Sequence, residues 1–234
     1  MLWSLCARAT TVEELSARLA EVEPQRPLRI VQAPKPSADD VSRVVSGGIV
    51  TRLLESANGN KAFGLALIPL SIGVFWAALN DETRHPGYTA VSYSEIVSGR
   101  ACASGRHVLQ FLPIPMISDR WWVGILTKNS ALMQASGGSI RELAWKSSVD
   151  PAEVTSASGQ AMIAQGEPIG YSRGAWFLVA VGARVTYLEY YLHSDPGGSV
   201  PSSMASMAAT KGVRDNILAI QRFAAEARPA CPIE

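Results

Sequence analysis

The side chains that could perform chemistry are few, and their spacing matches no catalytic or metal-binding pattern. His85, His107 and His193 lack the helical spacing of a ligand pair and have no matching cysteine or acidic partners, so we expect no zinc site. Ser118 lacks the Gly-x-Ser-x-Gly setting of a hydrolase nucleophile, and the sequence ties no histidine to it. The residue types therefore favour binding over covalent chemistry, and we expect no metal and no cofactor.

Aromatic and flexible apolar side chains are the stronger candidates. Tryptophan supplies a large, rigid apolar surface with a hydrogen-bond donor at one edge, which suits a sterol, an acyl chain or a polyketide. Methionine is flexible and polarizable, which suits a lid over such a ligand. The candidate ligand-binding residues are Phe111, Arg120, Trp121, Trp122, Trp145, Trp176, Tyr187, Tyr191, Met204 and Met207. Core packing is the alternative for the tryptophans and methionines, and a structural ion pair or backbone cap is the favoured interpretation of Arg120.

The composition indicates one sizeable domain with a nearly neutral surface. The chain has 234 residues, of which 47% are hydrophobic, and this is enough for one core. Its 21 Lys and Arg residues balance 20 Asp and Glu residues, for a formal net charge of +1. Such a balance supplies no field that attracts nucleic acid or an anionic membrane. We therefore expect no nucleic-acid partner and at most transient contact with a membrane.

Cysteine use and apolar runs bear on the compartment. Cys6, Cys102 and Cys231 lie far apart, and pairing two of them would leave one thiol over, so we expect free thiols. The longest apolar run, residues 62–79, is broken by glycine and proline, which predicts no transmembrane helix. Residues 1–9 lack the features of a signal peptide. These patterns favour the cytoplasm, although a chain trimmed of its leader would look the same.

Helical and extended patterns follow one another in a definite order. The expected helices cover residues 11–22, 37–45, 72–79 and 202–227. The expected strands cover residues 49–55, 61–70, 90–97, 107–112, 121–127, 140–147, 160–165, 175–181 and 184–193. Successive strands at hairpin spacing predict an antiparallel sheet, and the long last helix must pack against it. In the last strand both alternating faces carry large side chains, so parity does not show which face lines a cavity.

Three motifs in order give the chain a resemblance to a known family. Residues 76–81, Trp-Ala-Ala-Leu-Asn-Asp, are similar to the Trp-x-x-Leu-x-Asp segment that closes the first helical stretch of START lipid-binding domains. Residues 112–123 resemble the START pattern of a Pro-x-Pro turn, then Ser-Asp-Arg, then an aromatic strand. Residues 195–201 look like the Asp-Pro-Gly-Gly-x-Pro link before the final helix. Leu126 stands where family members often carry a charged residue, which implies a more apolar cavity.

The resemblance implies an α+β helix-grip fold, in which a curved antiparallel β-sheet wraps around a long C-terminal α-helix. It divides the chain into an N-terminal helical and proline-rich extension, residues 1–46, and a START-like ligand-binding domain, residues 47–228. The function that it implies is binding or transfer of a lipid, sterol or fatty acyl chain in an enclosed cavity. The alternative is an enzyme of the polyketide aromatase/cyclase type, in which Arg120, Tyr187 or Tyr191 would move protons. The ligand and the oligomeric state stay open.

Overall fold

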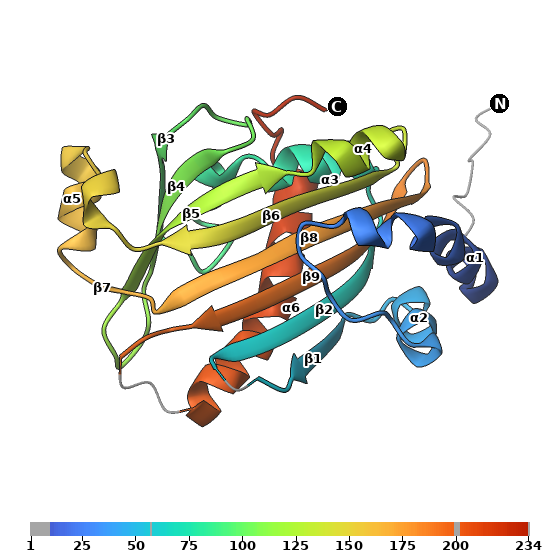
Figure 1. Cartoon of the computed structure of the whole chain (residues 1–234), viewed down its shortest axis with the longest axis horizontal. Helices are drawn as coiled ribbons and strands as arrows, with labels where there is room; N and C mark the ends of the chain where they lie inside the picture. The colour runs from blue at the N-terminus through green and yellow to red at the C-terminus, as the bar shows by residue number, and fades with distance from the viewer. Residues whose placement is uncertain (1–9, 57, 199–201, 234) are drawn as a thin grey trace.

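One β-sheet lies between two helical layers (Figure 1). The computed structural model describes residues 10–56, 58–198 and 202–233, apart from the side chains of residues 202–205, 207 and 208. A long C-terminal helix crosses behind the sheet in Figure 1, and short N-terminal helices lie in front of it. We call the face toward the C-terminal helix the inner face, and the face toward the N-terminal helices the outer face.

Antiparallel neighbours make up almost the whole sheet. Its strands are β1 (Val50–Leu54), β2 (Asn60–Ile68), β3 (Tyr93–Ser98), β4 (Arg106–Leu112), β5 (Arg120–Lys128), β6 (Ile140–Ser148), β7 (Glu167–Pro168), β8 (Tyr171–Gly182) and β9 (Val185–Asp195). The spatial order is β1-β2-β9-β8-β6-β5-β4-β3, with all neighbours antiparallel. The short strand β7 runs parallel to β5. The predicted antiparallel sheet is confirmed.

Helix α6 (Ser202–Glu226) packs closely on the inner face. Val213, Ile217 and Ile220 on its apolar stripe are buried. A Cβ on Gly64 of β2 would stand 2.4 Å from Cγ1 of Val213, so a glycine is needed where the helix crosses the strand. The expected helix-grip fold, with a sheet packed against a long C-terminal helix, is therefore confirmed.

The N-terminal segment covers part of the outer face. It comprises α1 (Val12–Val22), the 3₁₀ helix η1 (Glu23–Leu28) and α2 (Ala38–Val45). Thr11 and Glu14 form a capping box at the start of α1. The apolar faces of these helices pack against Phe63, Leu65 and Tyr187 of the sheet. The described part of the predicted extension is thus a layer of the fold.

The remaining helices connect strands. They are α3 (Ile72–Leu79), the 3₁₀ helix η2 (Glu82–Arg84), α4 (Ser130–Ala135), the 3₁₀ helix η3 (Pro151–Glu153) and α5 (Ala157–Ile163). The strand predicted over residues 160–165 is wrong, because α5 occupies this stretch. The Ser156 side chain accepts a hydrogen bond from the backbone N–H of Gly159 at 3.0 Å and starts the helix. Gly159 and Ile163 then turn inward on one face.

The prediction of free thiols is wrong for two of the three cysteines. Cys102, in the loop between β3 and β4, forms a disulfide with Cys231, which follows α6. The two residues are 129 positions apart, and their Cα atoms lie 5.5 Å from each other. Sequence spacing gives no sign of this pair because the fold alone brings the loop and the C-terminal tail together. Cys6 lies outside the described residues.

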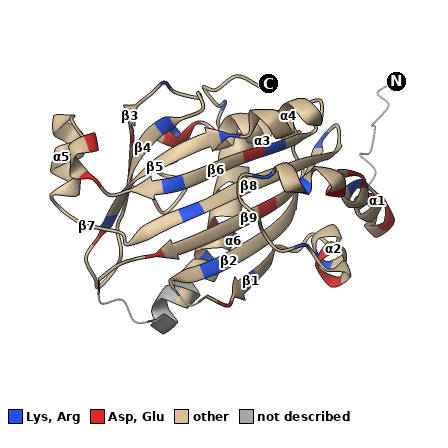
Figure 2. Ribbon diagram, in the orientation of Figure 1, with Lys and Arg blue, Asp and Glu red and all other residues tan. Residues whose placement is uncertain are grey.

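Charge and hydropathy in the described part of the chain agree with the composition. Figure 2 shows Lys and Arg interspersed with Asp and Glu over the helices and strands. No helix among the described residues is both long enough and apolar enough to cross a bilayer.

Candidate functional site

A cavity of about 640 Å³ lies between the inner face of the sheet and α6. Its size falls within the roughly 300–1,000 Å³ range of small-molecule sites. Strands β4, β5, β6, β8 and β9 form its walls, α6 forms one side, and residues 79–91 close one end. The lining is mainly apolar and includes Leu79, Leu112, Leu126, Leu143, Leu192 and Ile220. This cavity is therefore the candidate functional site.

Strand alternation decides which side chains reach the cavity. In β5, Trp122, Gly124 and Leu126 line it, whereas Trp121 and Val123 pack in a separate cluster on the outer face. Strand β9 follows the same rule from residue 190 to residue 194, and Asp195 joins the lining where the strand ends. Leu126 lines the cavity, and the resemblance implied an apolar wall at this position.

Three aromatic rings form one wall of the cavity. Trp176 stacks on Tyr190 with ring centroids 3.9 Å apart and planes at 14°, and Trp145 lies 5.6 Å from Tyr190. The Trp145 ring lies close to the backbone of Gly174, where an added Cβ would be 2.3 Å from Cζ2. Burial raises the pKa of the Tyr190 hydroxyl to about 12, so this group stays protonated at neutral pH. The wall offers a flat apolar ligand a preformed surface.

Arg120 lines the cavity, but its guanidinium is bound to the backbone. Nε donates to the carbonyl of Pro196 at 2.7 Å, and Nη1 donates to the carbonyl of Ser118 at 2.6 Å. Nη2 donates to the carbonyl of Gly197 at 3.3 Å, and Nη1 lies 3.4 Å from a carboxylate oxygen of Glu167. These contacts tie the start of β5 to the turn after β9. This arrangement agrees with the interpretation of Arg120 favoured from the sequence, a structural ion pair or backbone cap.

Four of the predicted site residues lie on the outer face, away from the cavity. Phe111 and Trp121 belong to a cluster beneath α5. Tyr187 and Tyr191 belong to the cluster that the N-terminal helices cover. Burial and the neighbouring Glu189 carboxylate raise the pKa of the Tyr187 hydroxyl well above its usual value. The structure therefore gathers Trp122, Trp145, Trp176 and Arg120 around one cavity, without these four.

Met204 and Met207 belong to the first turns of α6. Their side chains lie outside the described part of the structure. A lid contact of these residues therefore stays a prediction.

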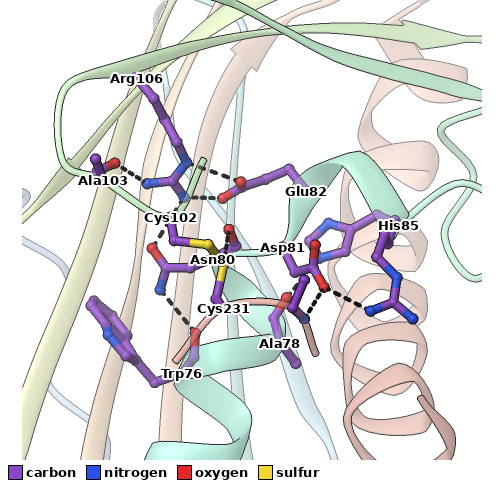
Figure 3. Close-up of a disulfide and its surroundings, with 12 residues drawn as sticks. Trp76, Ala78, Asn80, Asp81, Glu82, His85, Cys102, Ala103, Arg106 and Cys231 are labelled. Carbon is purple, nitrogen blue, oxygen red and sulfur yellow. Dashed lines mark hydrogen bonds and ion pairs between the residues drawn. A yellow bond between two sulfur atoms is a disulfide. The ribbon is translucent and has the colours of Figure 1, made fainter. Parts of the chain in front are cut away.

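Buried polar contacts and the disulfide hold the closed end of the cavity in place (Figure 3). Arg106 donates to both carboxylate oxygens of Glu82, at 3.0 Å from Nε, and to the side-chain oxygen of Asn80 at 3.1 Å. The backbone N–H of Ala230, beside the disulfide, donates to Asp81 at 2.8 Å. No sequence pattern predicted this network, and an arginine next to an apolar strand was the available signal for Arg106.

His85 also lies at the closed end and lines the cavity. Its Nε2 atom is 2.8 Å from the carbonyl oxygen of Ala78, and its ring makes an edge contact with Phe223. Burial lowers the pKa of the imidazole below its usual value. From the sequence, His85 was considered only as a possible metal ligand. In the structure it is a neutral residue in the wall of an apolar cavity.

The outer face carries two buried carboxylates whose partners come largely from the N-terminal segment. Glu189 accepts hydrogen bonds from Arg26 at 2.5 and 3.1 Å and from Arg29 at 2.6 Å. Glu142 accepts from the backbone N–H groups of residues 30 and 31 at 2.7 and 3.1 Å, and from Asn129 at 2.7 Å. Both carboxylates are fully buried and fully paired, so this cluster is structural.

A metal centre finds no support in the part of the chain that the structure describes. Within it, no three His, Cys, Asp or Glu side chains are grouped so that they could hold an ion. His107 instead pairs with Glu153 at 2.6 Å, and His193 contacts the hydroxyl of Tyr171 at 2.5 Å.

Comparisons with known proteins agree on the fold. No family model and no curated protein match the sequence. The STAR-related lipid transfer protein of Xanthomonas axonopodis superposes with a TM-score of 0.62 at 18% identity, over 76% of this chain and 94% of that one. Human StAR-related lipid transfer protein 5 gives a TM-score of 0.62 at 12% identity, over 92% and 97% of the two chains. A START superfamily protein from Mycobacterium smegmatis gives 0.52 at 10% identity, over 77% and 99%. This chain therefore has the fold of the START superfamily.

Proposed function

We propose that this protein binds an apolar small molecule of the lipid or sterol class in the cavity beneath α6, and carries or transfers it. The cavity itself supports the proposal, because about 640 Å³ of mainly apolar space lies between the sheet and α6 in a fold shared with lipid transfer proteins. Burial of the ligand's apolar surface contributes roughly 25 cal/mol per Å², which offsets the lost freedom of the bound molecule. No cofactor is needed for such a function.

Binding without turnover is the better-supported form of this proposal. A cyclase of the type considered above needs proton-transferring groups that meet at the ligand. Tyr187 and Tyr191 lie on the outer face, and the nitrogens of Arg120 donate to backbone carbonyls. The three residues considered for proton transfer therefore do not meet at the ligand, and carriage is the function that we propose.

The disulfide bears on where the protein works. Disulfides persist in oxidising compartments and are rare in the cytosol. The cytoplasm was favoured partly because free thiols were expected, and Cys102 and Cys231 are paired. We therefore propose an oxidising compartment. Thiol labelling of the protein from its own host tests this: reaction of Cys102 and Cys231 in the native protein would return the proposal to the cytoplasm.

Neighbouring tryptophans on opposite faces of β5 supply a test of ligand binding. An apolar fluorescent probe that enters the cavity should quench the emission of Trp122, and sterols or long-chain lipids should displace it. Trp122→Phe should reduce the quenching, whereas Trp121→Phe is the matched control on the outer face and should leave the quenching by the probe intact.

Two outcomes would count against the proposal. Displacement by no member of a broad panel of sterols, alcohols, fatty acids and phospholipids would show that the cavity does not carry a lipid. Equal loss of quenching in the two variants would place the probe outside the cavity. Native mass spectrometry of protein from its own host provides an independent readout, since a carrier should retain an apolar ligand.

A further inference from the structure

His85 lines the cavity, and its imidazole has one polar atom without a hydrogen-bond partner among the described residues. Because a carbonyl oxygen only accepts hydrogen bonds, the 2.8 Å contact with Ala78 places the ring proton on Nε2. The burial that lowers the pKa of this histidine keeps the ring neutral at neutral pH. Nδ1 therefore carries a lone pair, and none of the hydrogen bonds that His85 makes with the described residues uses it. The ring, only 7% exposed, is a built hydrogen-bond acceptor in an apolar wall.

The charges around the cavity disfavour an anionic ligand. Among the described lining residues, Arg120 is the one arginine or lysine, and each of its three nitrogens donates to a backbone carbonyl. Glu82, Asp195 and Asp215 are the carboxylates of the lining. A carboxylate or phosphate on the ligand would lie near these acceptors and the Nδ1 lone pair. Arg120 would not neutralise it, because its nitrogens already donate to backbone carbonyls.

We propose that the ligand is an uncharged apolar molecule with a hydroxyl group, which donates a hydrogen bond to Nδ1 of His85. This inference rests on the proposed function and narrows it, because it selects sterols and long-chain alcohols over fatty acids. The hydroxyl satisfies the one unpaired acceptor of the ring, and the rest of the molecule contacts the aromatic wall formed by Trp145, Trp176 and Tyr190. Selectivity then depends on the proton that the ligand donates.

Three ligands of equal chain length test the proposal by displacement of the apolar probe. They are 1-hexadecanol, its methyl ether and hexadecanoate, of which only the alcohol can donate a hydroxyl proton at neutral pH. The wild-type protein should bind the alcohol about five- to tenfold more tightly than the ether, as expected for one hydrogen bond. Hexadecanoate should bind more weakly than the alcohol.

Two substitutions separate the nitrogens of the ring. His85→Gln places an amide donor near the Nε2 position, so it keeps a bond to Ala78 but loses the acceptor at Nδ1. It should bind the alcohol and the ether with equal affinity. His85→Asn keeps an acceptor near the Nδ1 position and should retain part of the preference for the alcohol.

The ¹⁵N resonance of Nδ1 in the wild-type protein gives a readout that needs no variant to fold. It should shift on addition of the alcohol and stay in place with the ether. Three results would each overturn the hydroxyl assignment: equal wild-type affinity for alcohol and ether, a preference for the alcohol that survives in His85→Gln, or an unmoved Nδ1 resonance. If the ether still binds in any of these cases, the proposed carrier function stands. Binding of none of the three ligands would overturn both proposals.

Discussion

Filling the cavity from α6 is the most direct perturbation of the proposed function. Gly212 lies on α6 and lines the cavity, and a Cβ added there meets no atom within 4 Å. Gly212→Phe therefore adds a side chain whose first carbon stands in open space, and we expect its ring to extend into the cavity. Glycine within a helix is about 1 kcal/mol less favourable than alanine, so the substitution removes a local cost of the helix. The variant should fold at least as stably as the wild-type protein.

The expected loss of affinity follows from the surface of the added ring. A phenylalanine buries roughly 150–250 Å², and about half of this area would replace contacts that the ligand makes in the wild-type cavity. At about 25 cal/mol per Å², a loss of roughly 100 Å² of apolar contact weakens binding by about 2.5 kcal/mol. This corresponds to a dissociation constant about 70-fold higher.

Probe titration, combined with thermal unfolding, measures the two effects separately. Leu218→Phe is the matched control, because Leu218 belongs to the same helix but is 43% exposed. It should change neither affinity nor stability appreciably. If Gly212→Phe binds the probe and its competing lipids as tightly as the control does, the cavity is not the ligand site. If it unfolds the protein, the space beside Gly212 is needed for packing.

Three further predictions concern stability. Replacing Cys102 and Cys231 by serine should lower the free energy of unfolding by about 5 kcal/mol or less, since the bond closes a long loop; equal denaturation midpoints with and without reductant would contradict this. Glu189→Gln should cost roughly 3–5 kcal/mol in urea unfolding, because Arg26 and Arg29 lose the buried carboxylate that they share. The folded pKa of His85 lies below 6.5 despite the nearby Glu82 carboxylate. The free energy of unfolding should therefore decrease as pH falls below about 6.5, because His85 then binds a proton in the unfolded chain but not in the folded chain. His85→Gln should remove that part of the pH dependence, measured as the urea midpoint at a series of pH values.

The order of the elements could be predicted because its signals are local. The capping box at Thr11, the Ser71 cap of α3 and the hairpin between β1 and β2 each depend on a few adjacent residues. The motif at residues 112–123 likewise marks one turn and the strand that follows it. These local signals were therefore sufficient to predict the fold, including the long helix that packs against the sheet.

The face that lines the cavity could not be predicted, for a reason visible in the layers. An antiparallel sheet with one solvated face shows apolar and polar residues in alternation. Here α6 covers the inner face and the N-terminal helices cover the outer face, so β9 buries Tyr190 on one side and Tyr187 on the other. Aromatic residues therefore occur at both parities, and Phe111 and Trp121 are as apolar as the cavity residue Trp122.

The missed polar groups of the site depend on contacts between distant segments. Glu82 and Arg106 lie 24 positions apart, and the two bonded cysteines lie 129 apart. A single sequence contains no signal for such pairs, because each residue alone looks like a solvated charge or a free thiol. His85 was considered as a metal ligand because a histidine in sequence does not reveal which of its nitrogens finds a partner.

The N-terminal segment helps to determine which face of the sheet is left for a ligand. The division at residue 46 separates sequence patterns, yet Arg26 and Arg29 neutralise Glu189, and the backbone at residues 30 and 31 satisfies Glu142. Two buried carboxylates on the sheet thus obtain partners from outside the predicted START-like domain. With its outer face covered in this way, the sheet leaves the inner face for a ligand. Because the disulfide and the Glu82 network fix one end of that cavity, we expect ligand entry at the other end, beside the first turns of α6, where Met204 and Met207 stand in the sequence.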